Sequence, residues 1–94
     1  MKPKRLENRK LLKEVASRRC IISGCPEKSV ACHIGTKGAR QDDVENNLFP
    51  ACITHHGEQH TIGIISFARK YPEVGEEFTK KGWNISDYKL RRAE

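Results

Sequence analysis

The sequence predicts one small domain of the α+β class, and three observations favour this fold class. Helical periodicity near the N-terminus gives way to short apolar pieces between glycines and prolines, the pattern of a helix followed by short strands. Cysteines and histidines are concentrated in the middle of the chain. A chain of 94 residues buries little apolar surface, so we expect a bound metal to add stability that the core alone lacks.

The first expected element is a basic amphipathic helix within residues 5–18. Its apolar residues recur at intervals close to one helical turn, so they would form one stripe that packs on the rest of the domain. These residues are Leu6, Leu11, Leu12 and Val15. After this helix, apolar pieces at residues 21–22, 30–31 and 48–49 lie between glycines and prolines, and they predict short strands joined by irregular loops.

Helical segments are expected to return in the second half. A helix from His55 to about Lys70 would turn Ile62, Ile65 and Phe67 inward, and it would end before Pro72 because the residue before a proline disfavours the α conformation. One or two short C-terminal helices would follow, one of them within residues 72–83. The last piece covers residues 85–92, with Ser86 as a candidate helix cap and Trp83 and Tyr88 as expected core residues.

The positive charge is confined to one end of the chain. Residues 1–19 carry eight basic and two acidic side chains, so the whole net charge of +6 lies there. Such a block is typical of a surface that binds a phosphate backbone, although a solvated helix face is an equally good interpretation. The start of the sequence lacks the apolar core of a signal peptide, and no stretch approaches the ~20 apolar residues of a membrane span, so we expect a cytoplasmic protein that binds no membrane.

All four cysteines and all four histidines lie between Cys20 and His60. Disulfides are disfavoured without a secretory signal, whereas zinc takes four sulfur or nitrogen ligands that are commonly delivered as two close pairs. The pairs here are Cys20-x4-Cys25 and Cys52-x2-His55, which together predict a structural zinc site. Two alternatives stay open: a four-thiolate site with Cys32 in place of His55, or four free thiols in the core.

Three histidines remain once the zinc ligands are assigned. His56 and His60 stand four residues apart, so on a helix they share one face and can bind one cation, while His55 lies about 100° round the helix. His33 comes from a separate segment. Two helical histidines for a metal and one for proton transfer are an arrangement suited to hydrolysis.

The order of these residues resembles a known family. The series Cys20, Cys25, Cys32-His33-Ile34, Asn47-Leu48-Phe49-Pro50-Ala51-Cys52-x2-His55-His56-x3-His60 is similar to the HNH, or ββα-metal, endonucleases, in particular to small phage- and prophage-type members. The resemblance covers about residues 19–69. It implies a single domain over residues 1–94, with a basic helix in 1–19, a zinc-stapled ββα-metal core in 20–70 and a C-terminal helical extension in 71–94.

The resemblance also implies roles for individual residues. His33 would be the general base that activates water, and Asn47 would hold the loop after His33 and orient its ring, although Asn46 could exchange roles with Asn47. His56 and His60 would bind a catalytic divalent metal, Mg²⁺, Mn²⁺ or another transition metal. The implied activity is hydrolysis of DNA to 5′-phosphate and 3′-hydroxyl ends, in phage recombination or DNA processing. Duplex or branched DNA is the expected partner, while single-stranded nucleic acid and RNA stay open. A homodimer would suit a nuclease with one site per chain that cuts both strands.

The sequence departs from the family at three positions. Cys32 stands where many members carry Asp or His as a further metal ligand, Ala51 replaces a leucine, and His55 replaces a cysteine. The first change implies a metal with two protein ligands, or a preference for softer ions if Cys32 coordinates.

Basic side chains are the candidate DNA contacts. They are Arg5, Arg9 and Lys13 in the N-terminal helix and Lys37 and Arg40 in the loop after His33. An acidic cluster of Asp42, Asp43 and Glu45 is interpreted as a surface loop, with cation binding as the alternative. Two rival functions remain, a zinc-stapled DNA-binding module without catalysis and a protein-interaction adaptor.

Overall fold

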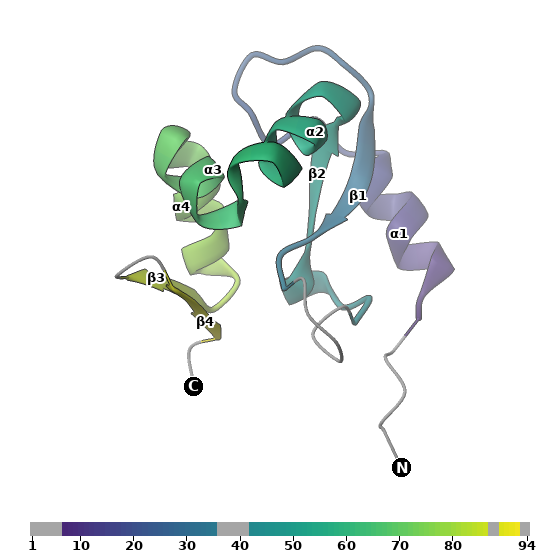
Figure 1. Ribbon diagram of the computed structural model, residues 1–94. Helices are drawn as coiled ribbons and strands as arrows, with labels where there is room; N and C mark the ends of the chain where they lie inside the picture. Colours follow the sequence, from purple (N-terminus) through teal and green to yellow (C-terminus); the bar gives the residue numbers. More distant parts are fainter. Residues whose placement is uncertain (1–6, 36–41, 87–88, 93–94) are drawn as a thin grey trace.

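The computed structural model describes residues 7–35, 42–86 and 89–92, and it shows an α+β domain built around a two-stranded ribbon (Figure 1). Strand β1 (Ser29–His33) pairs antiparallel with β2 (Leu48–Cys52), so that Ser29 lies opposite Cys52 and His33 lies opposite Leu48. Helix α2 (Ile53–Ile62) begins directly after β2, which completes the expected ββα order.

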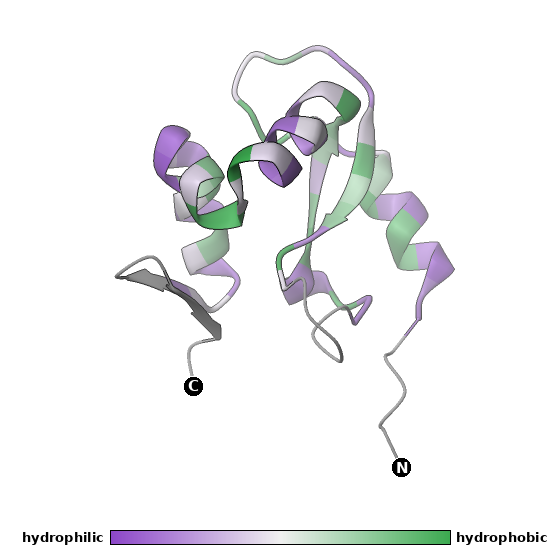
Figure 2. Ribbon diagram, in the orientation of Figure 1, coloured by the Kyte–Doolittle hydropathy of each residue, from purple (hydrophilic) through white to green (hydrophobic). Residues whose placement is uncertain are grey.

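Helix α1 (Arg9–Ala16) is the basic helix expected from the sequence, and it packs against both strands of the ribbon. The side chain of Asn8 begins it by accepting a hydrogen bond from the Leu11 N–H at 3.1 Å. Val15 is fully buried, while Leu11 and Leu12 are half-buried. Leu6, the remaining member of the expected stripe, lies outside the described residues. In Figure 2, α1 alternates between apolar and hydrophilic residues, whereas the ribbon is largely apolar.

The expected helix from His55 to about Lys70 is two helices. Gly63 adopts a φ of 91°, a conformation that favours glycine, and there α2 ends and α3 (Ile64–Lys70) begins. Phe67 is buried and Ile65 is half-buried as expected. The expectation for Ile62 is wrong, because its side chain is 38% exposed at the end of α2.

The C-terminal part contains one helix and one hairpin. Helix α4 (Pro72–Lys80) has proline at its first position, where the missing N–H costs nothing. The last piece is not a helix capped by Ser86. It forms strands β3 (Trp83–Ser86) and β4 (Lys89–Arg92), which pair antiparallel. Tyr88 lies outside the described residues.

The aromatic residues of the second half form the centre of the core. Phe49 of β2 contacts the rings of Phe67 and Phe78, with centroid distances of 6.4 and 5.2 Å. All three side chains are fully buried. Trp83 is 1% exposed, as expected for a core residue, and its indole N–H donates to the Asn46 carbonyl at 2.6 Å. Asn46 belongs to the short 3-10 helix Glu45–Asn47 that precedes β2, so the hairpin is tied to the ribbon.

Truncation of Phe78 should therefore destabilise the whole domain. We expect Phe78→Ala to lower the free energy of unfolding by about 3–5 kcal/mol, because it leaves a cavity beside Phe49. The matched control is Ile53→Ala, since Ile53 is 77% exposed and its loss should cost less than about 0.5 kcal/mol. Denaturant titration in saturating zinc measures both values, and equal effects of the two variants would contradict this description of the core.

Candidate functional site

Four side chains meet at one end of the ribbon with the geometry of a metal site. The ligand atoms of Cys20, Cys25, Cys52 and His55 all lie within 4.8 Å of one another. The two sulfurs of Cys25 and Cys52 are 3.9 Å apart, and the His55 Nδ1 lies 3.5 Å from the Cys20 sulfur and 3.1 Å from the Cys52 sulfur. These separations lie within a few tenths of an ångström of the roughly 3.4–3.8 Å between the ligand atoms of tetrahedral zinc. The cluster therefore can hold a metal ion.

The local fold explains why these four residues meet. Cys52 ends β2 and begins α2, and its sulfur accepts a hydrogen bond from the His55 N–H at 3.4 Å, which places His55 on the first helical turn. The loop from Cys20 to Cys25 contains Gly24 at a φ of 79°. The Ile21 N–H donates to the Pro50 carbonyl at 2.8 Å and fixes this loop to β2.

The surroundings shift the pKa values of two of these cysteines in opposite directions. Burial opposes ionisation of Cys52, but hydrogen bonds from the His55 N–H and from the thiols of Cys25 and Cys20 outweigh it and lower the pKa of Cys52. For Cys25, the Glu27 N–H favours the thiolate, whereas burial and the sulfurs of Cys20 and Cys52 raise its pKa above the ordinary value.

Cys32 lies outside this cluster. It is 1% exposed on β1, and its sulfur contacts the Val30 carbonyl at 3.6 Å. Burial raises the pKa of Cys32 to about 12, even though the Ala51 backbone opposes the shift, so the thiol stays protonated. The structure brings His55, and not Cys32, to the three other cysteines, and the four-thiolate alternative is wrong for this fold.

The other three histidines line one pocket. His56 and His60 project from one face of α2 with their Nε2 atoms 2.9 Å apart. His33, at the end of β1, lines the same hollow of about 500 Å³. Burial, and then the neighbouring charges of His60 and His33, lower the pKa of His56 and favour its neutral ring, the form that binds metals. The remaining lining residues are Ala31, Cys32, Gln59, Gly63 and Ile64.

Element lengths explain how a strand residue meets two helix residues. His33 lies at the opposite end of β1 from the metal cluster, four residues and about 13 Å along the strand from Ser29, which pairs with Cys52. Helix α2 starts at that cluster and packs against both strands, and the eight residues from Cys52 to His60 cover about 12 Å. Strand β1 and helix α2 both start at the cysteine end of the ribbon and run similar distances along it. His33 and the helix histidines therefore lie at a similar distance from the cluster.

Asn47 fixes both ends of the loop that follows His33. Its side chain is fully buried, with Oδ1 accepting from the Gly35 N–H at 2.8 Å and Nδ2 donating to the Asp42 carbonyl at 2.9 Å. Its backbone carbonyl accepts from the Ile34 N–H at 2.8 Å. Asn46 is exposed, and its carbonyl bonds to Trp83 instead. Asn47, and not Asn46, therefore holds the two ends of this loop.

Asp43 is a site residue that the sequence interpretation missed. The expectation of an exposed acidic loop is wrong for it, because Asp43 is 2% exposed and its Oδ1 lies 2.8 Å from the His33 Nε2. Of the cluster, Glu45 does face solvent, where it pairs with Arg18 at 2.6 Å. The sequence contains no feature that distinguishes the buried Asp43 from the acidic residues beside it.

The candidate DNA contacts are only partly described by the structure. Arg9 and Lys13 are exposed on α1, while Arg5, Lys37 and Arg40 lie outside the described residues. Within the described part of the chain, no helix has the length and apolar character needed to cross a membrane.

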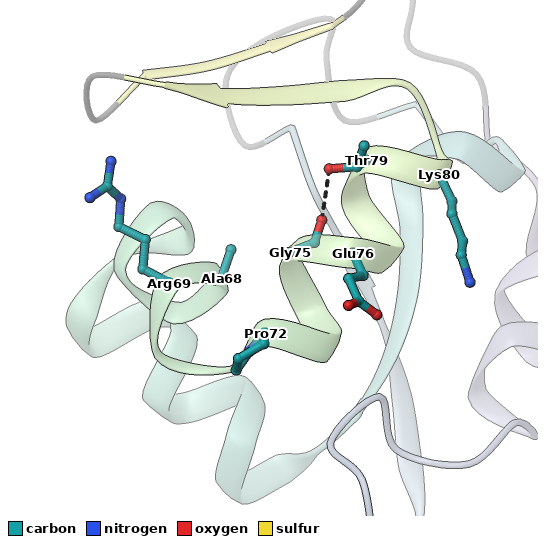
Figure 3. Close-up of a pocket in the computed structure, with 7 residues that line it drawn as sticks. All are labelled: Ala68, Arg69, Pro72, Gly75, Glu76, Thr79 and Lys80. Atoms are coloured by element: carbon teal, nitrogen blue, oxygen red, sulfur yellow. Dashed lines mark hydrogen bonds between the residues drawn. The ribbon is translucent and has the colours of Figure 1, made fainter.

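A second hollow, of about 620 Å³, lies between α3 and α4 (Figure 3). Its lining offers charged and small side chains, without the thiols or imidazoles that bind metals. The lining residues are Ala68, Arg69, Pro72, Gly75, Glu76, Thr79 and Lys80. Side chains of the types that can bind metals or transfer protons are thus grouped at the histidine pocket, although it is the smaller of these two hollows.

Comparison with known proteins agrees with this grouping. A family model described as "Putative HNHc nuclease" matches residues 5–86, which include both clusters, Asn47 and Asp43. No curated protein and no solved structure matches the chain. Since the family model covers most of the sequence, the chain belongs to the HNHc nuclease family.

Proposed function

We propose that this protein is a metal-dependent endonuclease that hydrolyses DNA phosphodiester bonds. The observation that carries the proposal is the pocket itself, in which a strand histidine and a pair of helix histidines meet. Membership of a nuclease family supports hydrolysis of nucleic acid in general. The net charge of +6 in the first 19 residues, with Arg9 and Lys13 exposed on α1, favours a phosphate backbone as the bound surface.

The cluster of Cys20, Cys25, Cys52 and His55 would hold a structural zinc. Its four side chains would supply the four ligands that structural zinc takes, which would leave no position for water or substrate. The proposed role is to hold the Cys20–Cys25 loop, the end of β2 and the start of α2 together.

His56 and His60 fit a second divalent ion. Two nitrogen ligands at about 2.1 Å and at right angles to each other would be about 3.0 Å apart, close to the 2.9 Å observed between their Nε2 atoms. The two rings would hold Mg²⁺, Mn²⁺ or another transition metal, with water and phosphate as the further ligands. When bound, such an ion supplies positive charge that stabilises a phosphate oxygen and the leaving 3′ oxygen.

His33 would act as the general base. A neutral imidazole takes a proton from water while the water oxygen bonds to phosphorus, and the bond from phosphorus to the 3′ oxygen breaks. The leaving 3′ oxygen takes a proton from a solvent water molecule, so the products are a 5′-phosphate and a 3′-hydroxyl. Asn47 would keep the loop after His33 in place through its bonds to Gly35 and Asp42.

The wider biological setting is also part of the proposal. The resemblance to phage- and prophage-type members supports a role in phage DNA recombination or processing, on duplex or branched DNA. One pocket per chain cuts one strand at a time, so a homodimer would serve for double-strand breaks.

Removal of a zinc ligand should release the metal and destabilise the fold. We expect purified protein to contain about one zinc per chain, and Cys25→Ser to lose most of it and to unfold at a lower temperature. Cys32→Ala is the matched control, because Cys32 lies outside the cluster and its loss should leave the zinc content unchanged. Elemental analysis and thermal unfolding measure both effects. Equal zinc in Cys25→Ser and the parent would contradict the assignment.

Removal of the general base should abolish cleavage without loss of structure. We expect His33→Ala to slow nicking of supercoiled plasmid by about 10²–10⁴-fold in Mg²⁺ or Mn²⁺, with zinc content and fold kept. Thermal stability should fall, because buried Asp43 loses a hydrogen-bond partner. Unchanged cleavage would exclude His33 as the base. Salt-dependent DNA binding by the parent protein without nicking in any divalent metal would instead favour a zinc-stapled DNA-binding module.

Removal of a metal-binding histidine should change the dependence of nicking on metal concentration. We expect His56→Ala to raise the Mn²⁺ concentration for half-maximal nicking by about tenfold or more, because one of two protein ligands is lost. Thr61→Ala is the control on the same helix, since its hydroxyl bonds only to the Gly57 carbonyl in the described structure. A His56→Ala titration that overlays the parent curve would count against the metal assignment.

A further inference from the structure

Asp43 is a carboxylate that the fold removes from water. Its side chain is 1% exposed, and burial of a carboxylate is costly unless hydrogen bonds compensate it. Both oxygens have such bonds. Oδ1 lies 2.8 Å from the His33 Nε2, and Oδ2 accepts from the backbone N–H of Asn8 at 2.9 Å.

The backbone on either side of this carboxylate is also fixed. Asn8 is the N-cap of α1, so the packing of this helix against the ribbon fixes the position of its N–H. The Asp42 carbonyl is held by the buried Asn47 side chain at 2.9 Å. Asp43 therefore cannot follow His33 if the ring rotates, and its Oδ1 presents a fixed acceptor.

A fixed acceptor selects one form of the imidazole. An ionised carboxylate only accepts hydrogen bonds, so the Nε2 of neutral His33 must carry the hydrogen and donate it to Asp43. Neutral histidine has one N–H, which leaves the lone pair on Nδ1. His33 lines the histidine pocket and its side chain is 24% exposed, and the lone pair on Nδ1 is then the ring position that can accept a proton from water.

We propose that Asp43 is the positioning residue of the nuclease site, which fixes the ring orientation and the Nε2–H tautomer of His33 and stabilises the ring once Nδ1 has taken a proton from water. The role of Asp43 in catalysis rests on the proposed nuclease function, whereas the orientation and tautomer of His33 do not. A carboxylate behind a histidine serves in this way in other hydrolases. The other titratable side chains that line the pocket with His33 are Cys32, His56 and His60.

The decisive variant is Asp43→Asn, because an amide offers one acceptor where two are needed. If its oxygen faces the Asn8 N–H, its NH₂ group faces His33 and favours the Nδ1–H tautomer, which has no lone pair for water. We expect kcat for plasmid nicking to fall about 10²–10⁴-fold, while DNA affinity and the Mn²⁺ concentration for half-maximal nicking stay within about twofold. A variant that merely loosens the pocket would change all three.

Nitrogen-15 NMR of the histidine rings supplies a readout that needs no activity. The parent protein, loaded with zinc alone, should show His33 as the Nε2–H tautomer at a pH where the ring is neutral, and Asp43→Asn should shift it toward Nδ1–H. Glu45→Gln is the matched control, because it changes a nearby carboxylate to an amide at the surface and should leave the tautomer and the nicking rate unchanged. If Asp43→Asn fails to fold, the tautomer measured in the parent protein tests the inference by itself.

The outcomes separate this inference from the proposed function. An Nδ1–H tautomer in the parent protein, or nicking by Asp43→Asn within about threefold of the parent, would overturn the role of Asp43 and leave the nuclease proposal standing. The expected tautomer in a parent protein that never nicks DNA would support the positioning of His33 and contradict the nuclease proposal.

Discussion

The cluster of Cys20, Cys25, Cys52 and His55 is the constraint on which the rest of the structure depends. It joins the loop before β1, the end of β2 and the first turn of α2 at one point. Helix α2 therefore leaves the ribbon at a fixed position and returns along it, which brings its two remaining histidines level with His33. A chain this small buries little apolar surface, so a metal bound in the cluster would add stability that the core alone lacks.

The opposite end of the ribbon is organised by buried polar groups rather than by thiols. Asn47 and Asp43 are both buried, and their side-chain bonds hold the loop after His33 and the ring of His33. Buried polar groups are costly when a partner is lost, so each tolerates few alternative arrangements. The two ends of the ribbon thus differ in kind. The closed cluster can hold a metal ion at the start of α2, and the open pocket brings three imidazole rings together.

The sequence was most informative where chemistry depends on spacing. Two close ligand pairs identified the metal cluster, and an interval of four residues placed His56 and His60 on one helix face. It was least informative where the outcome depends on tertiary packing. Nothing local distinguishes buried Asp43 from exposed Glu45, and the break at Gly63 and the hairpin after Gly82 depend on backbone conformations that a helical pattern hides. The residue types indicate the candidate site, whereas the hydrogen bonds of Asp43 and Asn47 follow only from the fold.

Anomalous diffraction from crystals grown with zinc and soaked in Mn²⁺ tests the central claim most directly, since each metal is located at its own absorption edge. The account predicts zinc among the three cysteines and His55, and manganese on the Nε2 atoms of His56 and His60 in the pocket that His33 lines. Zinc absent from the cysteine cluster, or manganese bound away from that histidine pair, would contradict it.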